Sequence, residues 1–238
     1  METKQLYLYD SYRRTFEAKI QKVNGNDVVV DQTVFHPLTG GVAYDTGTLQ
    51  NDSVKHSVVR VEINRETKEI THIVDDATGF KVDEIVKGEI LWDRRYRLMR
   101  LHTTAHLIAA VMYRDYEARI TGGQVDPEQA KMDFNLPRTD REIFEDAVKK
   151  ANLEVQKNTA LKIYFVDRAE ALKIPGVVKL AERMPPDVKD FRIVEIPGID
   201  LQADGGPHVN NTGEIGEISL VKIENKGHTQ RRLYFTVK

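Results

Sequence analysis

The spacing of apolar residues changes once along this chain, and the change restricts it to two dissimilar folding units. Over the first part, short runs of alternating or β-branched residues are separated by turn-forming pairs such as Asn24-Gly25. Residues 94–116 instead carry an apolar residue at every third or fourth position, which predicts an amphipathic helix. Because strands and helices need different periods, we expect one domain over residues 1–92 and a second over residues 93–238.

The first domain is predicted to be a small antiparallel β-barrel. Turn residues recur at short intervals and no long helical pattern is present, and many short strands of this kind are typical of a barrel. The expected strands are residues 6–9, 14–20, 27–31, 58–63 and 88–93.

The second domain is predicted to be an α+β structure with helices packed on an antiparallel sheet. A second helix is expected over residues 140–158, where Thr139 and Glu142 have the spacing of a capping box. A third, shorter helix is expected to begin at Asp167 and to end at Pro175. The strand-like runs of this domain are residues 131–136, 161–166, 191–196, 218–223 and 232–237.

The chain contains no cysteine, which narrows both its chemistry and its compartment. Disulfides, thiol catalysis and thiolate zinc sites are excluded, so any metal must be held by His, Asp or Glu. No run approaches the ~20 continuous apolar residues of a membrane helix. The first residues also lack the basic and apolar segments of a secretory signal. We therefore expect a cytoplasmic protein without a membrane segment.

Charge favours a nucleic-acid partner only at particular places. The formal net charge is −2, but acidic residues are in excess over residues 1–90 and basic residues over residues 91–238. A polyanion would therefore need a local basic patch. The candidates are Arg94, Arg95, Arg97 and Arg100 in one run, and Lys222, Lys226, Arg231 and Arg232 near the C-terminus. For either group the alternative is a set of solvated charges on amphipathic elements.

Two histidines stand four residues apart in the long predicted helix. At this spacing the side chains of His102 and His106 project from one face, close enough to converge on one ion. The alternative is two unrelated histidines beside an apolar stripe. The residue after His102 is Thr103, not the Glu that a metalloprotease helix uses as general base, which counts against peptidase chemistry.

A second candidate site lies far downstream, in the run Asp204-Gly-Gly-Pro-His208. The Gly205-Gly206-Pro207 turn could direct the two flanking side chains at one point. Alone, these residues would be a loop acid and a loop histidine with a structural role. Carboxylate oxygen and imidazole nitrogen are both zinc ligands, so together with the helix pair the run supplies four ligands from two segments.

These runs, taken with others, resemble a known family. The order and spacing of His102–His106, Ile120–Val125, Lys131–Phe134 and Asp204–Gly216 resemble the editing domain of alanyl-tRNA synthetase, and Phe35–Gly47 is similar to the glycine motif that precedes that domain. The chain has no room for an aminoacylation core. It is therefore identified as similar to the AlaX family of free-standing alanyl-tRNA editing proteins, in the medium-length form, over essentially all of its residues.

The resemblance implies an activity and a fold. Family members hydrolyse the ester that joins wrongly attached serine, and in some cases glycine, to alanine tRNA at a zinc site. An alanine pocket cannot strongly exclude an amino acid that merely adds a hydroxyl, so a second site must discard the product. The family fold is a translation-factor-like barrel followed by an editing domain shared with threonyl-tRNA synthetase.

The resemblance also implies roles for particular residues. His102, His106, Asp204 and His208 would be the metal ligands, with the two helix histidines at the catalytic centre. Thr121 and Gln124 would line the amino-acid pocket, where Thr121 would bond the hydroxyl of serine. Gly40 and Gly41 would form a loop that helps to shape the site around the tRNA end. Independently of the resemblance, the run of Arg94, Arg95, Arg97 and Arg100 leads directly into the helix of His102 and His106, so we expect these arginines to hold the tRNA.

One departure from the family pattern affects the metal. The family usually has Cys-Gly-Gly-Thr-His where this chain has Asp204-Gly-Gly-Pro-His208, so a carboxylate replaces a thiolate and binds zinc less tightly. Asp204 as ligand, three histidines with water, and a metal-poor site all remain open. The alternative function is a non-catalytic tRNA-binding module with the same fold, and a third is another metal-dependent hydrolase of small esters.

Overall fold

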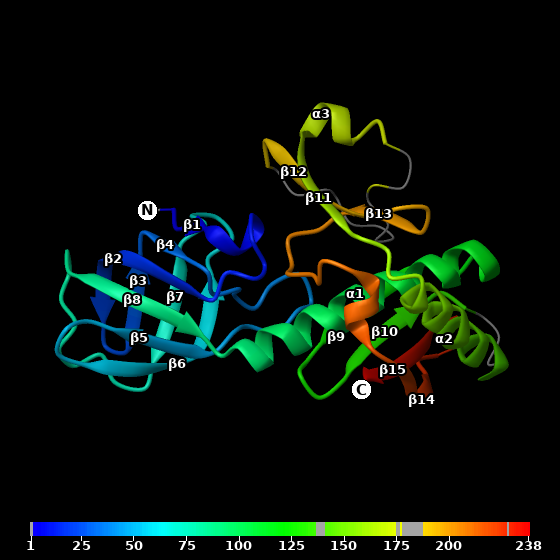
Figure 1. Cartoon of the computed structure of the whole chain (residues 1–238), viewed down its shortest axis with the longest axis horizontal. Coiled ribbons are helices and arrows are strands. Elements are labelled where there is room, and N and C mark those ends of the chain that lie inside the picture. The colour runs from blue at the N-terminus through cyan, green and yellow to red at the C-terminus, as the bar shows by residue number, and fades with distance from the viewer. Residues whose placement is uncertain (1, 137–140, 175–176, 178–187, 228) are drawn as a thin grey trace. The chain divides into compact units, whose positions relative to one another are not determined.

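The computed structural model describes residues 2–136, 141–174, 177, 188–227 and 229–238 (Figure 1). The chain divides into two compact units, Met1–Leu98 and Met99–Lys238. Helix α1 (Trp92–Tyr116) is continuous through this division, so its first turns belong to one unit and the remainder to the other.

The first unit is a closed antiparallel barrel in the order β2-β3-β7-β6-β5-β8, which confirms the predicted barrel. Its strands are β2 (Thr15–Asn24), β3 (Asp27–Val30), β5 (Gly47–Gln50), β6 (Lys55–Ile63), β7 (Ile70–Val74) and β8 (Ile85–Ile90). Two short strands, β1 (Lys4–Gln5) and β4 (Gln32–Thr33), pair in parallel beside it.

Alternation within the strands builds the barrel core. In β2, Phe16, Ala18 and Ile20 are buried while the residues between them face outward. Opposite Phe16 in β8 stands Gly88, and a Cβ atom at Gly88 would overlap the Phe16 ring. The glycine therefore makes space for an aromatic side chain inside a narrow barrel.

Two predicted strands of this unit differ in the structure. Residues 6–9 form a 3-10 turn, η1 (Leu6–Leu8), in which Leu6 accepts backbone hydrogen bonds from Tyr9 and Asp10. Leu6 and Tyr7 are both buried although they are consecutive, which a strand with alternating faces does not allow. The predicted 88–93 strand ends at Ile90, because the carbonyl of Leu91 already accepts the first α1 hydrogen bond, from Arg95.

The second unit confirms the predicted α+β class, and its described residues form two antiparallel sheets (Figure 1). The first sheet has the order β14-β15-β10-β9 and the second the order β11-β12-β13. The strands are β9 (Ile120–Val125), β10 (Ala130–Phe134), β11 (Lys162–Asp167), β12 (Asp190–Ile196), β13 (Asp200–Ala203), β14 (Ile218–Asn225) and β15 (Arg231–Val237). The connection from β13 to β14 contains a 3-10 turn, η2 (Thr212–Ile215).

Within the described residues, two further helices belong to this unit. Helix α2 (Arg141–Gln156) packs on β14, and Asn152 exchanges hydrogen bonds with the backbone of Ile218 at 2.9 Å. Helix α3 (Arg168–Ala171) is a single turn capped by the Asp167 carboxylate, and it packs on a small core with Phe191 of β12. The Thr139 cap and the Pro175 helix end lie outside the described residues.

No helix within the described ranges is both long and apolar enough to cross a membrane.

Candidate metal centre

Helix α1 presents His102 and His106 on one side, one turn apart. Both side chains are buried, and their rings meet edge to face with centroids 5.1 Å apart. The spacing of four residues places them on the same helical face, as the sequence predicts.

The turn after β13 brings two more side chains to this face. Asp204 continues the β13 pairing, because its backbone N–H donates to the carbonyl of Arg192 at 3.0 Å. A Cβ atom on Gly206 would lie 2.5 Å from a ring carbon of His102, so only glycine lets the turn approach the helix this closely. His208 then stacks on His102 with ring centroids 4.2 Å apart.

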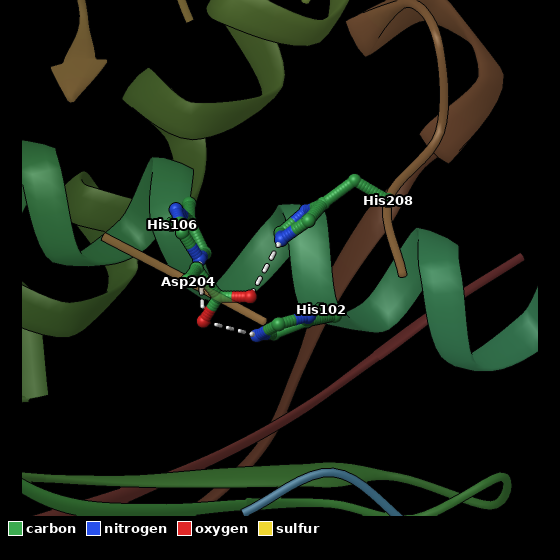
Figure 2. Close-up of side chains that lie close together, drawn as sticks. All are labelled: His102, His106, Asp204 and His208. Atoms are coloured by element: carbon green, nitrogen blue, oxygen red, sulfur yellow. Dashed lines mark hydrogen bonds and ion pairs between the residues drawn. The ribbon is translucent and has the colours of Figure 1, made fainter. Parts of the chain in front are cut away.

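The three imidazoles converge on the Asp204 carboxylate (Figure 2). Its Oδ2 atom lies 3.5 Å from His102 Nε2 and 3.9 Å from His106 Nε2, and its Oδ1 atom lies 3.3 Å from His208 Nε2. One ligand atom from each of the four residues lies within 4.8 Å of the other three. The structure thus brings together the helix pair and the Asp204–His208 run, which the sequence related only because all four side chains are possible zinc ligands.

The opposite nitrogen of each ring is held by a hydrogen bond. His102 Nδ1 lies 3.3 Å from the carbonyl of Pro207, and His106 Nδ1 lies 2.9 Å from Asp200 Oδ2. Both oxygens can only accept, so Nδ1 is the donor in each of these two contacts. The side-chain amide of Gln202 also lies 2.6 Å from His106 Nδ1.

His208 reaches the same protonation pattern through a hydroxyl. Its Nδ1 lies 3.0 Å from Thr103 Oγ1, and that hydroxyl donates its own proton to the carbonyl of Met99 at 2.9 Å. Thr103 therefore accepts from His208 Nδ1. In all three rings the Nε2 atom faces the carboxylate, and metal-binding histidines are held in this way, by the nitrogen that does not bind the ion.

Burial and the neighbouring charges alter the pKa values of the cluster. Burial lowers the pKa of His106, but hydrogen bonds and charge interactions with Asp200 and Asp204 outweigh it and raise that pKa to about 9. Burial raises the pKa of Asp204, but the facing imidazoles, His102 foremost, hold it well below its usual range. For His208, burial is the main cause of the shift and holds its pKa well below the usual range.

This donor set fits a metal ion. Three imidazole nitrogens and one carboxylate oxygen are the ligands, in type and number, of a four-coordinate zinc site. Metal ligands must be deprotonated, so a cation bound at their centre would displace the imidazole protons that face the Asp204 carboxylate.

The two predicted pocket residues lie on β9. The Oγ1 atom of Thr121 is buried and, among the described residues, has no hydrogen-bond partner. A buried hydroxyl without a partner can bond a ligand that enters later. The Gln124 side chain is exposed and donates to Asp126 Oδ2 at 2.7 Å.

The prediction that Arg95 holds a phosphate is wrong. Its side chain is fully buried and forms an ion pair with Asp45, which is also fully buried. The same guanidinium donates to the carbonyls of Ser11 at 2.9 Å and Val34 at 2.6 Å. All of its donors face protein oxygens inside the first unit, so no phosphate can reach it.

The other arginines of this run are partly exposed. Arg94 donates to the carbonyl of Tyr44 at 2.9 Å and covers the Tyr44 ring, and Arg100 donates to the carbonyl of Ile215 at 2.9 Å. Arg97 stands between them on the same helix.

The C-terminal basic residues are largely paired. Arg231 is buried and donates to the carbonyl of Gly227 at 2.8 Å, and Arg232 forms a two-fold ion pair with Asp133 at 2.6 and 2.7 Å. For these residues the structure favours a role within the sheet.

Gly40 and Gly41 form a tight turn in the first unit. Their φ angles are 61° and 83°, values that favour glycine, and the turn is closed by a 3.0 Å hydrogen bond from Val42 N to the carbonyl of Thr39. Both glycines are exposed.

Several residues that support the ligands were not predicted from the sequence. Asp200 and Thr103 fix the rings of His106 and His208, and Arg192 donates to the carbonyls of Asp204 at 2.8 Å and Gly206 at 3.0 Å. Asp200 stands four residues before Asp204, but nothing in that spacing indicates that it faces an imidazole.

Comparison with known proteins relates both parts of the chain to tRNA synthetases. Residues 191–234 match the family described as threonyl and alanyl tRNA synthetase second additional domain, and residues 2–94 match the family of class II (A) tRNA synthetases. An alanine–tRNA ligase of Sulfurisphaera tokodaii is 34% identical over 93% of this chain, which covers 25% of the ligase.

Two relatives match along their whole length. The alanyl-tRNA editing protein AlaX-M of Saccharolobus solfataricus is 51% identical over 99% of both chains. The protein of the same name from Methanosarcina barkeri is 40% identical over 99% of both chains. At this identity and coverage, the chain belongs to the AlaX-M family of alanyl-tRNA editing proteins.

Proposed function

We propose that this protein is a zinc-dependent aminoacyl-tRNA deacylase that removes serine, and also glycine, from mischarged alanine tRNA. The observation that carries the proposal is the convergence of three imidazole Nε2 atoms on the Asp204 carboxylate in a buried cluster. Family membership supports tRNA carrying the wrong amino acid as the substrate class, and the cytoplasm as the compartment.

His102, His106, Asp204 and His208 would hold the ion. When bound there, Zn²⁺ would supply a Lewis acid that polarises an ester carbonyl. The chain's own part is to fix the geometry beforehand: Pro207, Asp200 and Thr103 each hold one ring by its Nδ1 atom. Ligands that are held in place before the substrate arrives cost no reorganisation during the reaction.

Selection of the amino acid would fall to Thr121. Its buried hydroxyl can bond the hydroxyl of a seryl group, whereas an alanyl group would leave it unpaired. We propose Gln124 as a second residue of this pocket and the Gly40-Gly41 turn as a loop that acts on the tRNA end. Arg94, Arg97 and Arg100 are the proposed phosphate contacts, because each remains partly exposed.

The proposal is tested by release of amino acid from seryl-tRNA(Ala), with alanyl-tRNA(Ala) as the competing substrate, on protein of measured zinc content. Wild type should release serine faster than alanine. His102→Ala should lower the rate at least about 100-fold. Removing only an outer hydrogen-bond partner of a metal ligand already lowers metal affinity or activity about 10- to 100-fold, and this change removes a ligand itself.

The matched control is His56→Gln, which replaces a histidine of barrel strand β6 whose Nε2 contacts the carbonyl of Thr78. It should keep the wild-type rate and zinc content. Binding of tRNA without release of serine would instead support a non-catalytic tRNA-binding module. Equal hydrolysis of a small seryl ester without tRNA would support a general esterase.

A further inference from the structure

A buried carboxylate stands behind one of the three imidazoles. The Asp200 side chain is 0% exposed, and its Oδ2 atom lies 2.9 Å from His106 Nδ1. Asp200 opens strand β13 and pairs with Ile196 of β12, so the sheet fixes its backbone independently of helix α1. The same Oδ2 atom accepts from the Gln202 amide at 3.0 Å, which orients the carboxylate.

The three rings are held differently. His102 donates to a peptide carbonyl and His208 to a hydroxyl, both of which are neutral acceptors. Of the three Nδ1 atoms in this described cluster, only that of His106 lies against a carboxylate. A hydrogen bond to a carboxylate is stronger than one to a neutral oxygen, and it makes the far nitrogen of the ring a better electron donor.

The charge of a bound cation also points to a role for Asp200. A divalent cation with three neutral imidazoles and the Asp204 carboxylate would leave one positive charge uncompensated among three buried rings. A buried charge without a partner is costly. Asp200 contributes a second negative charge one ring away from the ion, which offsets part of the positive charge of the ion and of the buried Arg192 guanidinium.

We propose that Asp200 is a positioning residue that holds His106 as a metal ligand and balances the charge of the bound cation. This inference rests on the metal site of the proposed function. Asp200 acts through His106 and does not touch the ion, and its loss should weaken metal binding without removing a ligand.

The test uses Zn²⁺ alone as the probe, on the full chain. The zinc dissociation constant is measured by competition with a chromophoric chelator for wild type and for Asp200→Asn, which keeps the size of the side chain. We expect the constant to rise about 10- to 100-fold, the usual effect of removing an outer partner of a metal-binding histidine. The matched control is Glu195→Gln on the adjacent strand, whose carboxylate bonds Tyr164 at 3.2 Å; it should bind zinc as wild type does.

A second measurement separates positioning from loss of structure. In zinc-loaded protein labelled with ¹⁵N-histidine, the Nδ1–H signal of His106 should shift in Asp200→Asn while the signals of His102 and His208 stay in place. A variant that misfolds would disturb all three signals. An unchanged zinc constant, or an unchanged His106 signal, overturns the inference. The proposed function fails separately, if zinc-loaded wild type releases no serine.

Discussion

At position 204 a carboxylate completes a cluster whose other three donors are imidazoles. Oxygen is a harder ligand than thiolate sulfur, so the affinity for a borderline-soft ion such as zinc should be lower than a cysteine at the same position would give. The turn that carries Asp204 is fixed by Arg192, which donates to the Asp204 carbonyl, and by the close approach of Gly206 to His102. Asp204 Oδ1 also accepts from the backbone N–H of Gly206 at 2.6 Å.

Asp204→Cys should therefore tighten zinc binding. We expect at least about a tenfold lower dissociation constant, equivalent to about 1.4 kcal/mol. Chelator competition measures the change, and Asp204→Ala provides the opposite control, with weaker binding than wild type. If the cysteine variant binds zinc no better than the alanine variant, residue 204 is not a ligand and the ion rests on the three histidines.

Replacing Thr121 should raise the stability of the protein and lower its selectivity for the substrate. Its buried Oγ1 atom lacks a partner among the described residues, so Thr121→Val should stabilise the free protein by about 1 kcal/mol. The same change should narrow the preference for seryl- over alanyl-tRNA by about three- to tenfold, the value of one hydrogen bond. Urea unfolding and paired deacylation rates measure the two effects.

The control for this prediction is Thr71→Val on barrel strand β7, which should change neither the preference nor the deacylation rate. If Thr121→Val leaves the ratio of the two rates unchanged, the hydroxyl of Thr121 does not recognise the substrate.

At the scale of elements, the first turn of α1 is fastened to the barrel unit by a buried ion pair. Arg95 and Asp45 are both fully buried, and Asp45 Oδ2 also accepts from the backbone N–H of His36 at 2.6 Å. Removing one partner leaves an uncompensated buried charge, so Arg95→Met should destabilise the protein by about 3–5 kcal/mol.

Urea unfolding tests this prediction, and Arg141→Gln serves as the control, because its partner Glu145 is exposed on α2. The double variant Arg95→Met with Asp45→Asn should regain part of the loss, since the unpaired charge is gone. A loss below about 1 kcal/mol in Arg95→Met, the value of a surface pair, would contradict the role of a buried anchor.

The barrel strands also hold a neutral histidine. His72 of β7 is fully buried against Thr33 Oγ1 at 2.8 Å, and burial lowers its pKa from 6.5 to about 4. The folded state therefore resists protonation, and the stability present above pH 6.5 should decline as the pH falls from 6.5 to 4, by about 3 kcal/mol in total.

Urea unfolding at a series of pH values measures this slope. His72→Gln, which keeps a hydrogen-bonding group but does not titrate, should unfold with a shallower dependence on pH between 6.5 and 4. An equal slope in wild type and variant would assign the acid sensitivity to other groups.

At the scale of the whole molecule, the question is how a chain of net charge −2 holds a polyanion. Of the arginine run on α1, Arg95 is buried, which leaves Arg94, Arg97 and Arg100 as partly exposed candidates. Each phosphate contact that is lost should reduce the dependence of log affinity on log salt by about 0.7–0.9.

Arg97→Gln should accordingly weaken tRNA binding and flatten its salt dependence by about one phosphate contact, without a change in zinc content. Fluorescence titrations with uncharged tRNA(Ala) at several salt concentrations measure both quantities. The matched control is Arg141→Gln on α2. If the variant and the control behave alike, the tRNA contacts lie elsewhere on the molecule.

The sequence by itself determined those features that depend on near neighbours along the chain. The period of two over the first part and the period of three to four over residues 94–116 predicted the barrel and α1, because each element buries one face of its own repeat. The four-residue spacing of His102 and His106 is likewise local to one helix. The order and spacing of several short motifs, from Phe35–Gly47 to Asp204–Gly216, were sufficient to recognise the family.

Only the tertiary structure decided what depends on partners far apart in sequence. The run of basic residues predicted Arg95 as a phosphate contact, but Arg95 is buried and bonds Asp45, which lies 50 residues away in the sequence. Burial depends on the elements that pack on a side chain, and these are not visible in the local sequence. Asp200, 94 residues from His106, joins the histidine cluster only through the tertiary contact of β13 with α1. The predicted strand at residues 6–9 was wrong for the same reason, because Leu6 and Tyr7 are consecutive and both pack in the barrel core.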